Sequence, residues 1–600
     1  MKQSRTLYVF ACFFITSFYN QRFFDPSNLI ALVPNISNAA RTRKIRLHGK
    51  NVDPPPSAAV CVIAKDDEAY INEWVDYHRA LGFSHFFVYD DSEDNLMKQW
   101  GQEKGENVTL IHYPAQMKQS IMYNAQADCA RRAAFGGRYQ WIAFFDIRTF
   151  LILKQHSNVR DFLDAHCPTG ALRIHRMVFG TAGQRTYRPK PVTKRFLYRQ
   201  AEPDERVNII FRTQDLSIDA TNQSIHLEVG SRFQDTSGEV NVSSAVSSRK
   251  PSDVAVFHYY LRSEKEYFHK MGKPVHFQDS ENIPDNVEYN LTNGTVFDDS
   301  AWEAVKRLVP KYSMYDLDLA GEAPRYPSQH PSETAVICAL LKYEEAYVDE
   351  WVDYHHALGF SDFYLYDNSP GFELEQWASE KGDHVTMTHF PQEGGQSNMF
   401  THCLKEHAAK MNHTWVAFLD ADEMVILKKH NNIVDLLHEH CESGALSLNW
   451  IQFGPGRREV YEPLPYSKRL LYRQQGDVDD WLKTIGRVED IDLDYDSPHP
   501  HRSYLKNGIQ HDTNGEEMTS AWNPDGPIDV AFIHHYFSKS YREFIAKRVR
   551  GDAYHGNGKL NDTISEAQER RLDWRDPRFS VDGWENTKRF LPKYQLFDHF

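Results

Sequence analysis

Residues 415–427 read WVAFLDADEMVIL, and residues 141–153 read WIAFFDIRTFLIL. Both stretches are apolar and rich in residues that favour β-strands, and each is interrupted by a turn that begins with aspartate. The turn reads DADE in the later stretch and DIRT in the earlier one. This one difference inside two otherwise similar stretches indicates a duplicated chain whose halves differ in chemistry.

The later turn carries two carboxylates, Asp420 and Asp422. Side chains two residues apart on a strand point the same way, so we expect both to face one ligand. Hard divalent cations bind carboxylate oxygens together with substrate phosphates, whereas Arg148, at the position of Asp422, cannot ligate a metal. The sequence therefore predicts a metal site in the second half, with an ordinary acidic turn as the alternative.

The duplication extends over most of the chain. EAYINEWVDYHRALGFSHFFVYD at 68–90 matches EAYVDEWVDYHHALGFSDFYLYD at 345–367, and VTKRFLYRQ at 192–200 matches YSKRLLYRQ at 466–474. Each repeat spans about 265 residues, which is the size of a domain rather than of a solenoid unit. The predicted organisation is a signal anchor or signal peptide (1–24), a stem (25–56), a degenerate first domain (57–320), a linker (321–333) and a catalytic domain (334–600).

The N-terminal anchor is predicted from the uncharged, mainly apolar run Leu7 to Tyr19, which follows Lys2 and Arg5. A run of this length fits the apolar region of a signal sequence and is short for a membrane span. A short signal anchor is preferred, a cleaved signal peptide is the alternative, and a buried helix of a cytosolic protein is the third interpretation. The first two place the chain in the secretory pathway.

Eight N-x-S/T motifs agree with that route, although each alone is weak: Asn35, Asn107, Asn222, Asn241, Asn290, Asn293, Asn412 and Asn561. Apart from Cys12, the cysteines fall three per repeat in matching order, Cys61, Cys129 and Cys167 and then Cys338, Cys403 and Cys441. They lack the C-x-x-C spacing of zinc sites. One disulfide and one free thiol per repeat is one interpretation, and three free thiols is the other.

The charge pattern argues against a nucleic-acid partner. The net charge is −15, the sequence pI is about 6.0, and no long block of lysine and arginine occurs. Nucleic-acid binding depends on clustered positive charge, so an anionic substrate would need a local metal or a local basic cluster.

Within a repeat, strands and helices are predicted to alternate. TAVICALL (334–341) is a continuous apolar run, the following residues to Gly359 have helical spacing, and DFYLYD (362–367) is a second strand. Alternation of this kind predicts an α/β fold with a mostly parallel sheet. Ligands of such sheets lie beyond the carboxyl ends of the strands, where Lys342, Asp367 and Asp420 fall.

These residues carry a resemblance to a known family. K-Y-E-E-x-Y-x-x-E-W-x-x-Y-H-x-x-L-G-F (342–360), D-A-D-E (420–423), W-x-x-F-G (450–454), K-T-I (483–485) and H-Y-F-x-K-S-x-x-E-F-x-x-K (535–547) occur in order. The second repeat thus resembles glycosyltransferase family 92 and related family-2-like transferases. The resemblance implies a GT-A fold, a UDP-sugar donor (UDP-galactose in characterised members), Mn²⁺ or Mg²⁺, inversion at the anomeric carbon, and a single-pass type II protein with a luminal catalytic domain in the Golgi or ER membrane.

Under this resemblance the donor-site residues can be named. Asp422 is expected to bind the metal and Asp420 the metal or the ribose, and His535, or its neighbour His534, would complete the metal ligands. Lys483 and Arg487 are expected to offset diphosphate charge, and Lys342, Glu344 and Asp367 to line the nucleotide pocket, with a structural turn as the alternative for Asp367. Trp351 and Tyr354 are assigned to the core, and Glu350 to a cap or pair.

An inverting transfer also needs a carboxylate to take the acceptor proton. Four acidic residues of one segment are candidates: Asp479, Asp480, Glu489 and Asp490. Glu489 is preferred because the first repeat has Gln214 there.

The first repeat keeps the scaffold but loses polar site residues. Arg148 stands for Asp422, Thr149 for Glu423, Asn208 for Lys483 and Gln214 for Glu489, whereas His258 matches His535. The sequence therefore predicts a transferase that moves a hexose from a nucleotide sugar to a glycan or glycoprotein acceptor, with a degenerate first domain. Two alternatives stay open: a non-catalytic glycan-binding scaffold and a nucleotidyltransferase.

Overall fold

The structure is a computed structural model of the 600-residue chain. It describes residues 44–46, 57–113, 121–219, 225–241, 254–317, 326–550 and 578–600, with gaps at 93–94, 96, 114–120, 135–136, 229–230, 237–239, 260, 271–293, 457, 474–477 and 495–498. The predicted N-terminal anchor lies outside the described residues. Among those that are described, no helix combines the length and apolarity needed to cross a bilayer.

The second repeat is built on a mixed sheet in the order β18-β17-β16-β19-β23-β21-β25-β20, with β24 beside β21. Its strands are β16 (Ala335–Leu341), β17 (Asp362–Asp367), β18 (Val385–His389), β19 (Trp415–Phe418), β20 (Glu423–Leu427), β21 (Gly444–Gln452), β23 (Leu482–Arg487), β24 (Ile509–His511) and β25 (Ala531–His535). Strands β16 to β19 run parallel, whereas β23 is antiparallel to both β19 and β21. The expected α/β fold is present, and the sheet is mixed.

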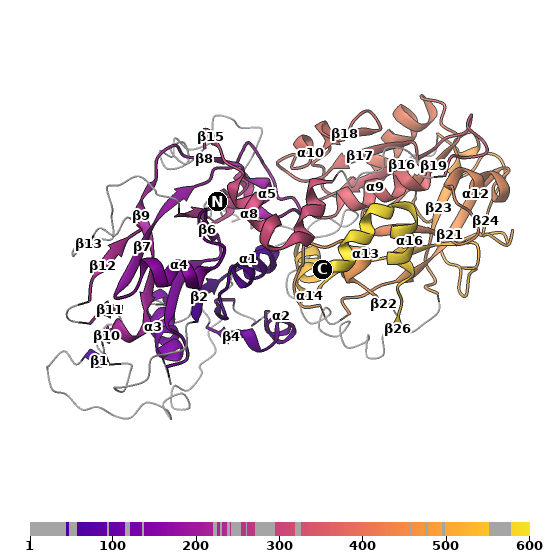
Figure 1. The fold of residues 1–600 in the computed structure, drawn as a ribbon. Coiled ribbons are helices and arrows are strands. Elements are labelled where there is room, and N and C mark those ends of the chain that lie inside the picture. Colours follow the sequence, from indigo (N-terminus) through magenta and orange to yellow (C-terminus); the bar gives the residue numbers. More distant parts are fainter. Residues whose placement is uncertain are drawn as a thin grey trace, which may run out of the picture. The chain divides into compact units, whose positions relative to one another are not determined.

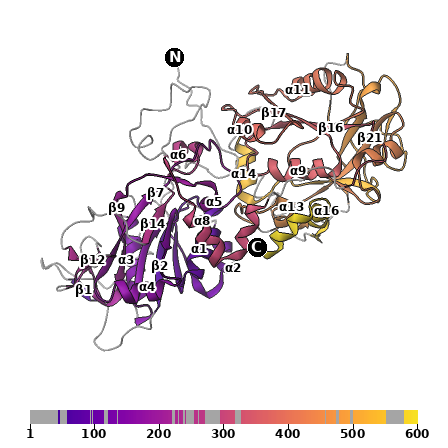
Figure 2. The same ribbon diagram turned by 45° about the horizontal axis from the view of Figure 1, so that its top comes forward.

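Helices connect these strands (Figures 1 and 2). They are α9 (Val348–Leu358), α10 (Glu375–Ser379), α11 (Gln396–His402) with a π-helical continuation (Cys403–Ala409), α12 (Ile433–His440), α13 (Tyr466–Arg469), α14 (Tyr541–Arg550) and α16 (Asp582–Phe590). Helix α9 ends at Gly359, whose φ of +112° suits a residue without a side chain. A Cβ at Gly359 would lie 2.5 Å from Oδ1 of Asn432, so the chain also needs glycine here for space.

The first repeat repeats this design in the order β13-β12-β7-β9-β5-β2-β3-β4, with β14 beside β7 and β6 beside β14. Its strands are β2 (Ala58–Ala64), β3 (His85–Asp90), β4 (Val108–His112), β5 (Trp141–Asp146), β6 (Thr149–Leu153), β7 (Ala171–Val178), β9 (Asp204–Arg212), β12 (Phe233–Asp235), β13 (Val240–Asn241) and β14 (Val254–His258). A smaller sheet joins β1 (Lys44–Arg46), β10 (Leu216–Asp219) and β11 (Ile225–Leu227). The helices are α1 (Glu68–Ala80), α2 (Lys98–Glu103), α3 (Ile121–Ala134), α4 (Val159–His166), α5 (Val192–Arg195), α6 (Glu264–Lys270) and α8 (Ser300–Leu308).

The motif E-W-V-D-Y-H, which both repeats share, is structural. In α9 the indole N–H of Trp351 donates to the carbonyl of Glu423 (2.7 Å), and the hydroxyl of Tyr354 donates to the carbonyl of Val425 (2.7 Å). The backbone N–H of Val425 in turn donates to Nε2 of His355 (3.3 Å). We call these three side chains the helix clamp. They form hydrogen bonds with the backbone of the first residues of β20. All three are fully buried, as the assignment of Trp351 and Tyr354 to the core predicted.

The first repeat has the same helix clamp. Trp74 donates to the carbonyl of Thr149 (2.7 Å) and Tyr77 to the carbonyl of Leu151 (2.8 Å). Glu350, which precedes the clamp in the second repeat, accepts hydrogen bonds from the backbone N–H of Tyr466 (2.7 Å) and therefore caps α13. The shared motif thus positions the strand that follows each turn.

The cysteines form one disulfide and leave one buried thiol in each repeat. Cys61 is bonded to Cys129 and Cys338 to Cys403. The free cysteines of the described chain are Cys167 and Cys441, and burial raises their pKa to about 12 and about 11. Of the two cysteine patterns predicted, the structure therefore has the first.

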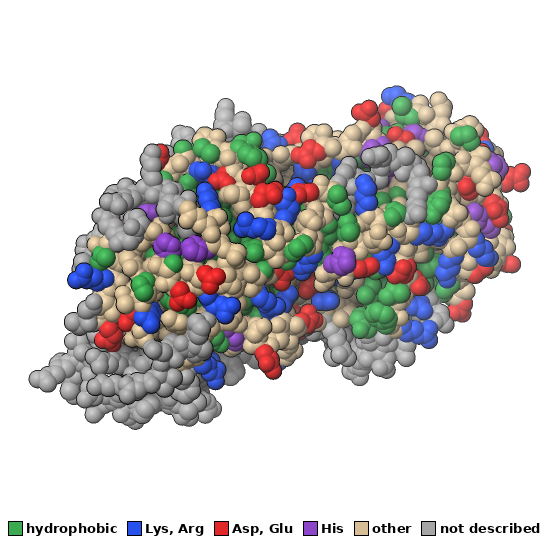
Figure 3. Space-filling view, in the orientation of Figure 1, with side chains coloured by type: hydrophobic (Ala, Val, Ile, Leu, Met, Phe, Trp, Pro, Cys, Tyr) green, Lys and Arg blue, Asp and Glu red, His purple; other side chains and the backbone are tan. Residues whose placement is uncertain are grey.

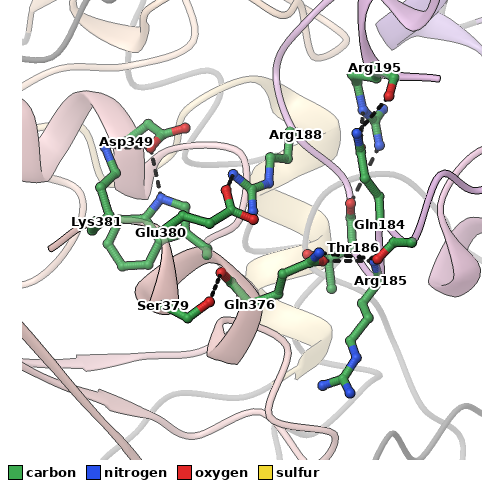
Figure 4. A network of polar contacts seen from close by, with 12 residues as sticks. Gln184, Arg185, Thr186, Arg188, Arg195, Asp349, Gln376, Ser379, Glu380 and Lys381 are labelled. Atoms are coloured by element: carbon green, nitrogen blue, oxygen red, sulfur yellow. Dashed lines mark hydrogen bonds and ion pairs between the residues drawn. The ribbon is translucent and has the colours of Figure 1, made fainter. Parts of the chain in front are cut away.

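The two structural units do not follow the repeat boundary near residue 320. The C-terminal unit comprises residues 179–199 and 260–600, and the N-terminal unit holds the rest of the first repeat. Two ion pairs join residues 179–199 to the second repeat: Arg185 pairs with Glu375 (2.6 Å), and Arg188 pairs with Glu380 (2.7 Å), the pair that Figure 4 shows. Two segments of the predicted domain of residues 57–320 thus cluster with the second repeat, and the domain boundaries stay a prediction.

The helix clamp can be tested in each unit separately. Tyr354→Phe removes the donor to the buried carbonyl of Val425, so we expect the C-terminal unit to lose about 1–3 kcal/mol of unfolding free energy while the N-terminal unit keeps its own. Hydrogen exchange measured by mass spectrometry in increasing urea reports on the two units independently. Tyr77→Phe is the matched control and should show the reverse pattern; equal effects on both units would contradict this role.

Candidate active site

The acidic turn of the second repeat, residues 420–423, joins β19 to β20. The backbone N–H of Asp420 donates to Oε2 of Glu423 (3.0 Å), and the N–H of Glu423 donates to the carbonyl of Asp420 (3.0 Å). Because the first and last residues close the turn, the carboxylates of Asp420 and Asp422 face other elements. The sequence had suggested that both side chains project from a strand, but in the structure they lie in a turn. Each contacts a different lysine.

Lys483, the second residue of β23, binds the first of these carboxylates. Its Nζ lies 2.9 Å from Oδ2 of Asp420 and 3.2 Å from Oε2 of Glu423, and its side chain is 1% exposed. Burial favours the neutral form of Asp420, but the adjacent Lys483 ammonium outweighs it and lowers the pKa of Asp420. Burial dominates at Glu423 and raises its pKa to about 8. Lys483 therefore keeps Asp420 ionised beside a protonated Glu423.

Asp422 is held from the C-terminal end of the chain. Nζ of Lys547, on α14, lies 2.5 Å from its Oδ2, and Nε2 of His535, the last residue of β25, lies 3.7 Å from its Oδ1. Burial opposes ionisation of Asp422, but Lys547 and His535 hold its pKa well below the usual range. Burial lowers the pKa of His535 to about 4, so its imidazole is neutral at neutral pH.

These side chains could hold a divalent cation. Two ionised carboxylates and a neutral imidazole are donors that Mn²⁺ accepts, and Mg²⁺ accepts the carboxylates. Nδ1 of His535 is buried and has no hydrogen-bond partner among the described residues. His534, in contrast, packs among aromatic rings, 4.4 Å from Phe453 between ring centroids. The donor types therefore suit a cation and favour His535 over His534, although the described clusters whose ligand atoms all lie within 4.8 Å of one another do not include these three residues.

Three residues predicted for the site lie at the other end of the sheet. Because β23 is antiparallel to β19, Arg487 pairs with Trp415 at the start of β19, whereas Asp420 follows its end. Arg487 donates to Glu489 (2.6 Å), and Asp490 accepts from the backbone N–H of Gly444 (2.8 Å). The structure thus does not bring Arg487, Glu489 or Asp490 to the acidic turn, and the preference for Glu489 as the base is corrected.

Asp367 has a structural role. Its carboxylate is fully buried and accepts from the backbone N–H groups of Ser369 (2.8 Å) and Leu374 (2.9 Å). Burial and the nearby Glu373 raise its pKa to about 7. Asp90 binds its own loop in the same way in the first repeat, through Ser92 (2.9 Å). The alternative of a structural turn therefore holds for Asp367.

The other predicted pocket residues follow β16. Lys342 directly succeeds this strand, at the carboxyl edge of the sheet. Glu344 is buried and forms an ion pair with Lys539 (2.8 Å). Lys539 and Lys547 both belong to the sequence motif of 535–547, but neither was singled out, because no spacing rule links them to carboxylates more than a hundred residues earlier.

Asp479 is linked to the site through Gln452. It hydrogen-bonds with the side chain of Gln452, and Gln452 pairs with His535 in the sheet. Its Oδ1 accepts from the backbone N–H of Trp481 (2.9 Å), and burial raises its pKa. Asp480 contributes its backbone carbonyl to Asn523 (2.7 Å).

The corresponding turn of the first repeat is closed by an internal ion pair. Nε and Nη2 of Arg148 lie 2.9 and 3.0 Å from the two carboxylate oxygens of Asp146. Burial opposes ionisation of Asp146, but Arg148 holds its pKa below the usual range. Nδ1 of His258 hydrogen-bonds with Oγ1 of Thr149 (3.2 Å), and His258 also helps to lower the pKa of Asp146. This turn has no pair of free carboxylates.

Comparison with known sequences identifies the family. The model of glycosyltransferase family 92 matches residues 57–286 and 334–478, more than half of the chain, and one segment falls in each repeat. The chain therefore belongs to glycosyltransferase family 92.

Curated relatives share part of the sequence. A family 92 protein of Oryza sativa subsp. japonica is 26% identical over 185 residues, which cover 30% of this chain and 31% of that protein. One from Ricinus communis is 25% identical over 195 residues, covering 31% and 34%. The chain thus spans about a third of the length of these relatives.

Solved structures are more distant. Glucosyl-3-phosphoglycerate synthase from Mycobacterium tuberculosis, in complex with Mn²⁺, UDP and glucosyl-3-phosphoglycerate, is 12% identical with a TM-score of 0.16, covering 26% of this chain and 57% of its own. HddC from Yersinia pseudotuberculosis is 7% identical with a TM-score of 0.21, covering 35% and 96%. At such scores neither structure bears on the function of this chain.

Proposed function

We propose that the second repeat is a metal-dependent hexosyltransferase that moves a sugar from a UDP-sugar to a glycan or glycoprotein acceptor. Galactose is the sugar that the family resemblance suggests. The observation that carries the proposal is the contrast between the two turns: among the described residues, Asp420 and Asp422 form ion pairs with lysines from distant elements, whereas Asp146 forms an ion pair with Arg148 of its own turn.

On the donor side, Asp420, Asp422 and His535 would hold Mn²⁺ or Mg²⁺. When bound, the ion supplies Lewis-acid stabilisation of the leaving diphosphate. Lys483 and Lys547 place two ammonium groups against the same carboxylates. Their positive charge is fixed before reaction, so it lowers the energy of negative charge that develops on the leaving group.

On the acceptor side, Asp479 is the general base of the proposal. Its carboxylate is half-buried and hydrogen-bonded with Gln452, and its raised pKa makes it a stronger base than an exposed aspartate. It would take the proton from the acceptor hydroxyl as that oxygen attacks the anomeric carbon from the face opposite the diphosphate, which inverts the configuration.

The first repeat is a non-catalytic domain in this proposal. Arg148 takes the place of a metal ligand and neutralises the remaining aspartate, Asp146, within the turn. Asn208, which replaces Lys483, accepts a hydrogen bond from Arg176 (2.6 Å).

The proposed site predicts which carboxylate is essential. Asp422→Asn keeps the shape of the side chain but removes its charge, so we expect Mn²⁺-dependent release of UDP to fall about 100-fold or more. The measurement is nucleotide release by the purified full-length protein from a panel of nucleotide sugars, with Mn²⁺ and with EDTA. Asp146→Asn, at the matching position of the first repeat, is the control and should retain activity.

Other outcomes of this assay separate the alternatives. Equal loss in both variants would refute the assignment of activity to the second repeat. Transfer of a nucleotidyl group, seen in the product mass, would identify a nucleotidyltransferase. Absence of both turnover and binding for every donor would indicate a glycan-binding pseudoenzyme.

The base makes a separate prediction about pH. A general base must be deprotonated, so transfer should decline as pH falls through the raised pKa of Asp479. In Asp479→Asn we expect transfer to be about 100- to 10,000-fold slower and this acid limb to vanish, while UDP release without acceptor persists. The profile of kcat/KM against pH, with Asp480→Asn as control, tests this; an unchanged limb in Asp479→Asn assigns the base elsewhere.

The compartment is a further part of the proposal. A luminal, type II protein of the Golgi or ER membrane is supported by the apolar run Leu7 to Tyr19 and by the two disulfides, which form in oxidising compartments. In protein from the native cell, alkylation before and after denaturation should label Cys167 and Cys441 only once unfolded, and peptide masses should show the two disulfides. Free thiols at Cys338 and Cys403 would contradict a luminal location.

A further inference from the structure

A row of aromatic rings leads from the acidic turn to the protein surface. Ring centroids are 4.2 Å apart between His535 and Trp450, 6.2 Å between Trp450 and Trp481, and 4.3 Å between Trp481 and Trp522. Trp450 is 8% exposed, whereas Trp522 is 51% exposed. The row therefore begins beside the partner of Asp422 and ends at an indole that water reaches.

The exposed end of the row is held by a defined network. Nδ2 of Asn449, a fully buried residue of β21, donates to the carbonyl oxygens of Asn523 (2.7 Å) and Asp479 (3.2 Å). A Cβ added at Gly526 would lie 2.1 Å from Oδ1 of Asn449, so the loop packs directly on this residue. Asn449 thus ties the segment that carries Trp522 to the segment that carries Trp481.

The first repeat lacks the whole row. Arg176 stands at the position of Trp450 and Arg206 at that of Trp481, and the sequence has no tryptophan between Trp141 and Trp302. Both arginines make polar contacts instead, Arg176 with Asn208 (2.6 Å) and Arg206 with Asp204 (2.8 Å). The fold therefore does not require these tryptophans, and they occur in the repeat whose turn carries Asp420 and Asp422.

We propose that Trp481 and Trp522 form the acceptor subsite, on which a neutral hexose ring of the acceptor glycan stacks. This inference rests on the proposed transfer at Asp420 and Asp422. One face of a pyranose is lined with C–H groups, and covering an exposed indole with it removes apolar surface from water while the hydroxyl groups stay at the rim. The indole N–H of Trp450, which has no acceptor among the described residues, adds a buried donor next to this path.

The charge around the row selects the class of sugar. Asp479 and Asp480 directly precede Trp481, and Nδ2 of Asn523, next to Trp522, contacts the carboxylate of Asp512 (3.4 Å). Like charges repel, so a carboxylate or sulfate on the stacked sugar would be disfavoured. The subsite therefore fits a neutral hexose better than a sialylated or sulfated one. Figure 3 shows one face of the molecule, on which acidic and basic side chains are interspersed.

The test separates acceptor binding from donor chemistry. Binding of the full-length protein to an array of neutral, sialylated and sulfated oligosaccharides is compared for wild type and Trp522→Ala, together with Mn²⁺-dependent UDP release without acceptor. We expect Trp522→Ala to bind the neutral glycans at least about tenfold more weakly, with unchanged UDP release. Phe579→Ala, which removes another exposed aromatic side chain of the same unit (61% exposed), is the matched control and should change neither.

Each other result overturns the subsite. Equal binding by wild type and Trp522→Ala, or preference of the wild type for anionic glycans, refutes it while leaving the transferase proposal intact. Loss of UDP release in Trp522→Ala assigns the row to the donor. Wild-type protein that releases no UDP from any donor refutes the transferase proposal itself.

Discussion

The helix clamp is the interaction on which the rest of each sheet depends. Trp351 and Tyr354 bind backbone carbonyls of β20 across the core, and Trp74 and Tyr77 do the same for β6. Buried carbonyls need partners, so these bonds fix the helix against the strand within a narrow range. Since each strand begins directly after its acidic turn, the clamp also fixes where that turn lies. The bonds of the clamp involve none of the charged groups of the turn, so the position of the strand that follows the turn is independent of those charges.

That independence lets one scaffold carry two electrostatic states. In the first repeat the counter-charge of Asp146 comes from the same turn, through Arg148. In the second repeat the counter-charges come from β23 and α14, through Lys483 and Lys547. An ion pair formed within one four-residue turn is not easily displaced by a ligand. Carboxylates whose lysine partners lie on separate elements can bind a cation in place of a lysine when those elements move.

Much of the fold could be predicted from sequence because it rests on local patterns. Continuous apolar runs predicted the parallel strands, and Gly359 predicted the end of α9. The matching order of the cysteines in the two repeats was consistent with one disulfide per repeat. The difference between the repeats misled the choice of Glu489: Gln214 replaces it in the first repeat, but β23 runs away from Asp420 toward Glu489, so the substitution lies far from the acidic turn. Asp367 was ambiguous because a carboxylate at a strand end suits a ligand and a loop equally well. Lys547 and Trp522 reach the site only through tertiary pairing, which no spacing rule encodes.

Residues 179–199 and 260–317 of the first repeat belong to the C-terminal unit. This has a consequence for whether the gene can lose its first repeat. Lys265, from the first repeat, is buried in an ion pair with Glu345 and lies 3.7 Å from Glu373, both in the second. Buried carboxylates without a partner are costly. A gene that lost its first repeat at the boundary near residue 320 would encode Glu345 and Glu373 without their lysine. The buried carboxylates of the second repeat thus depend on a lysine that the first repeat supplies.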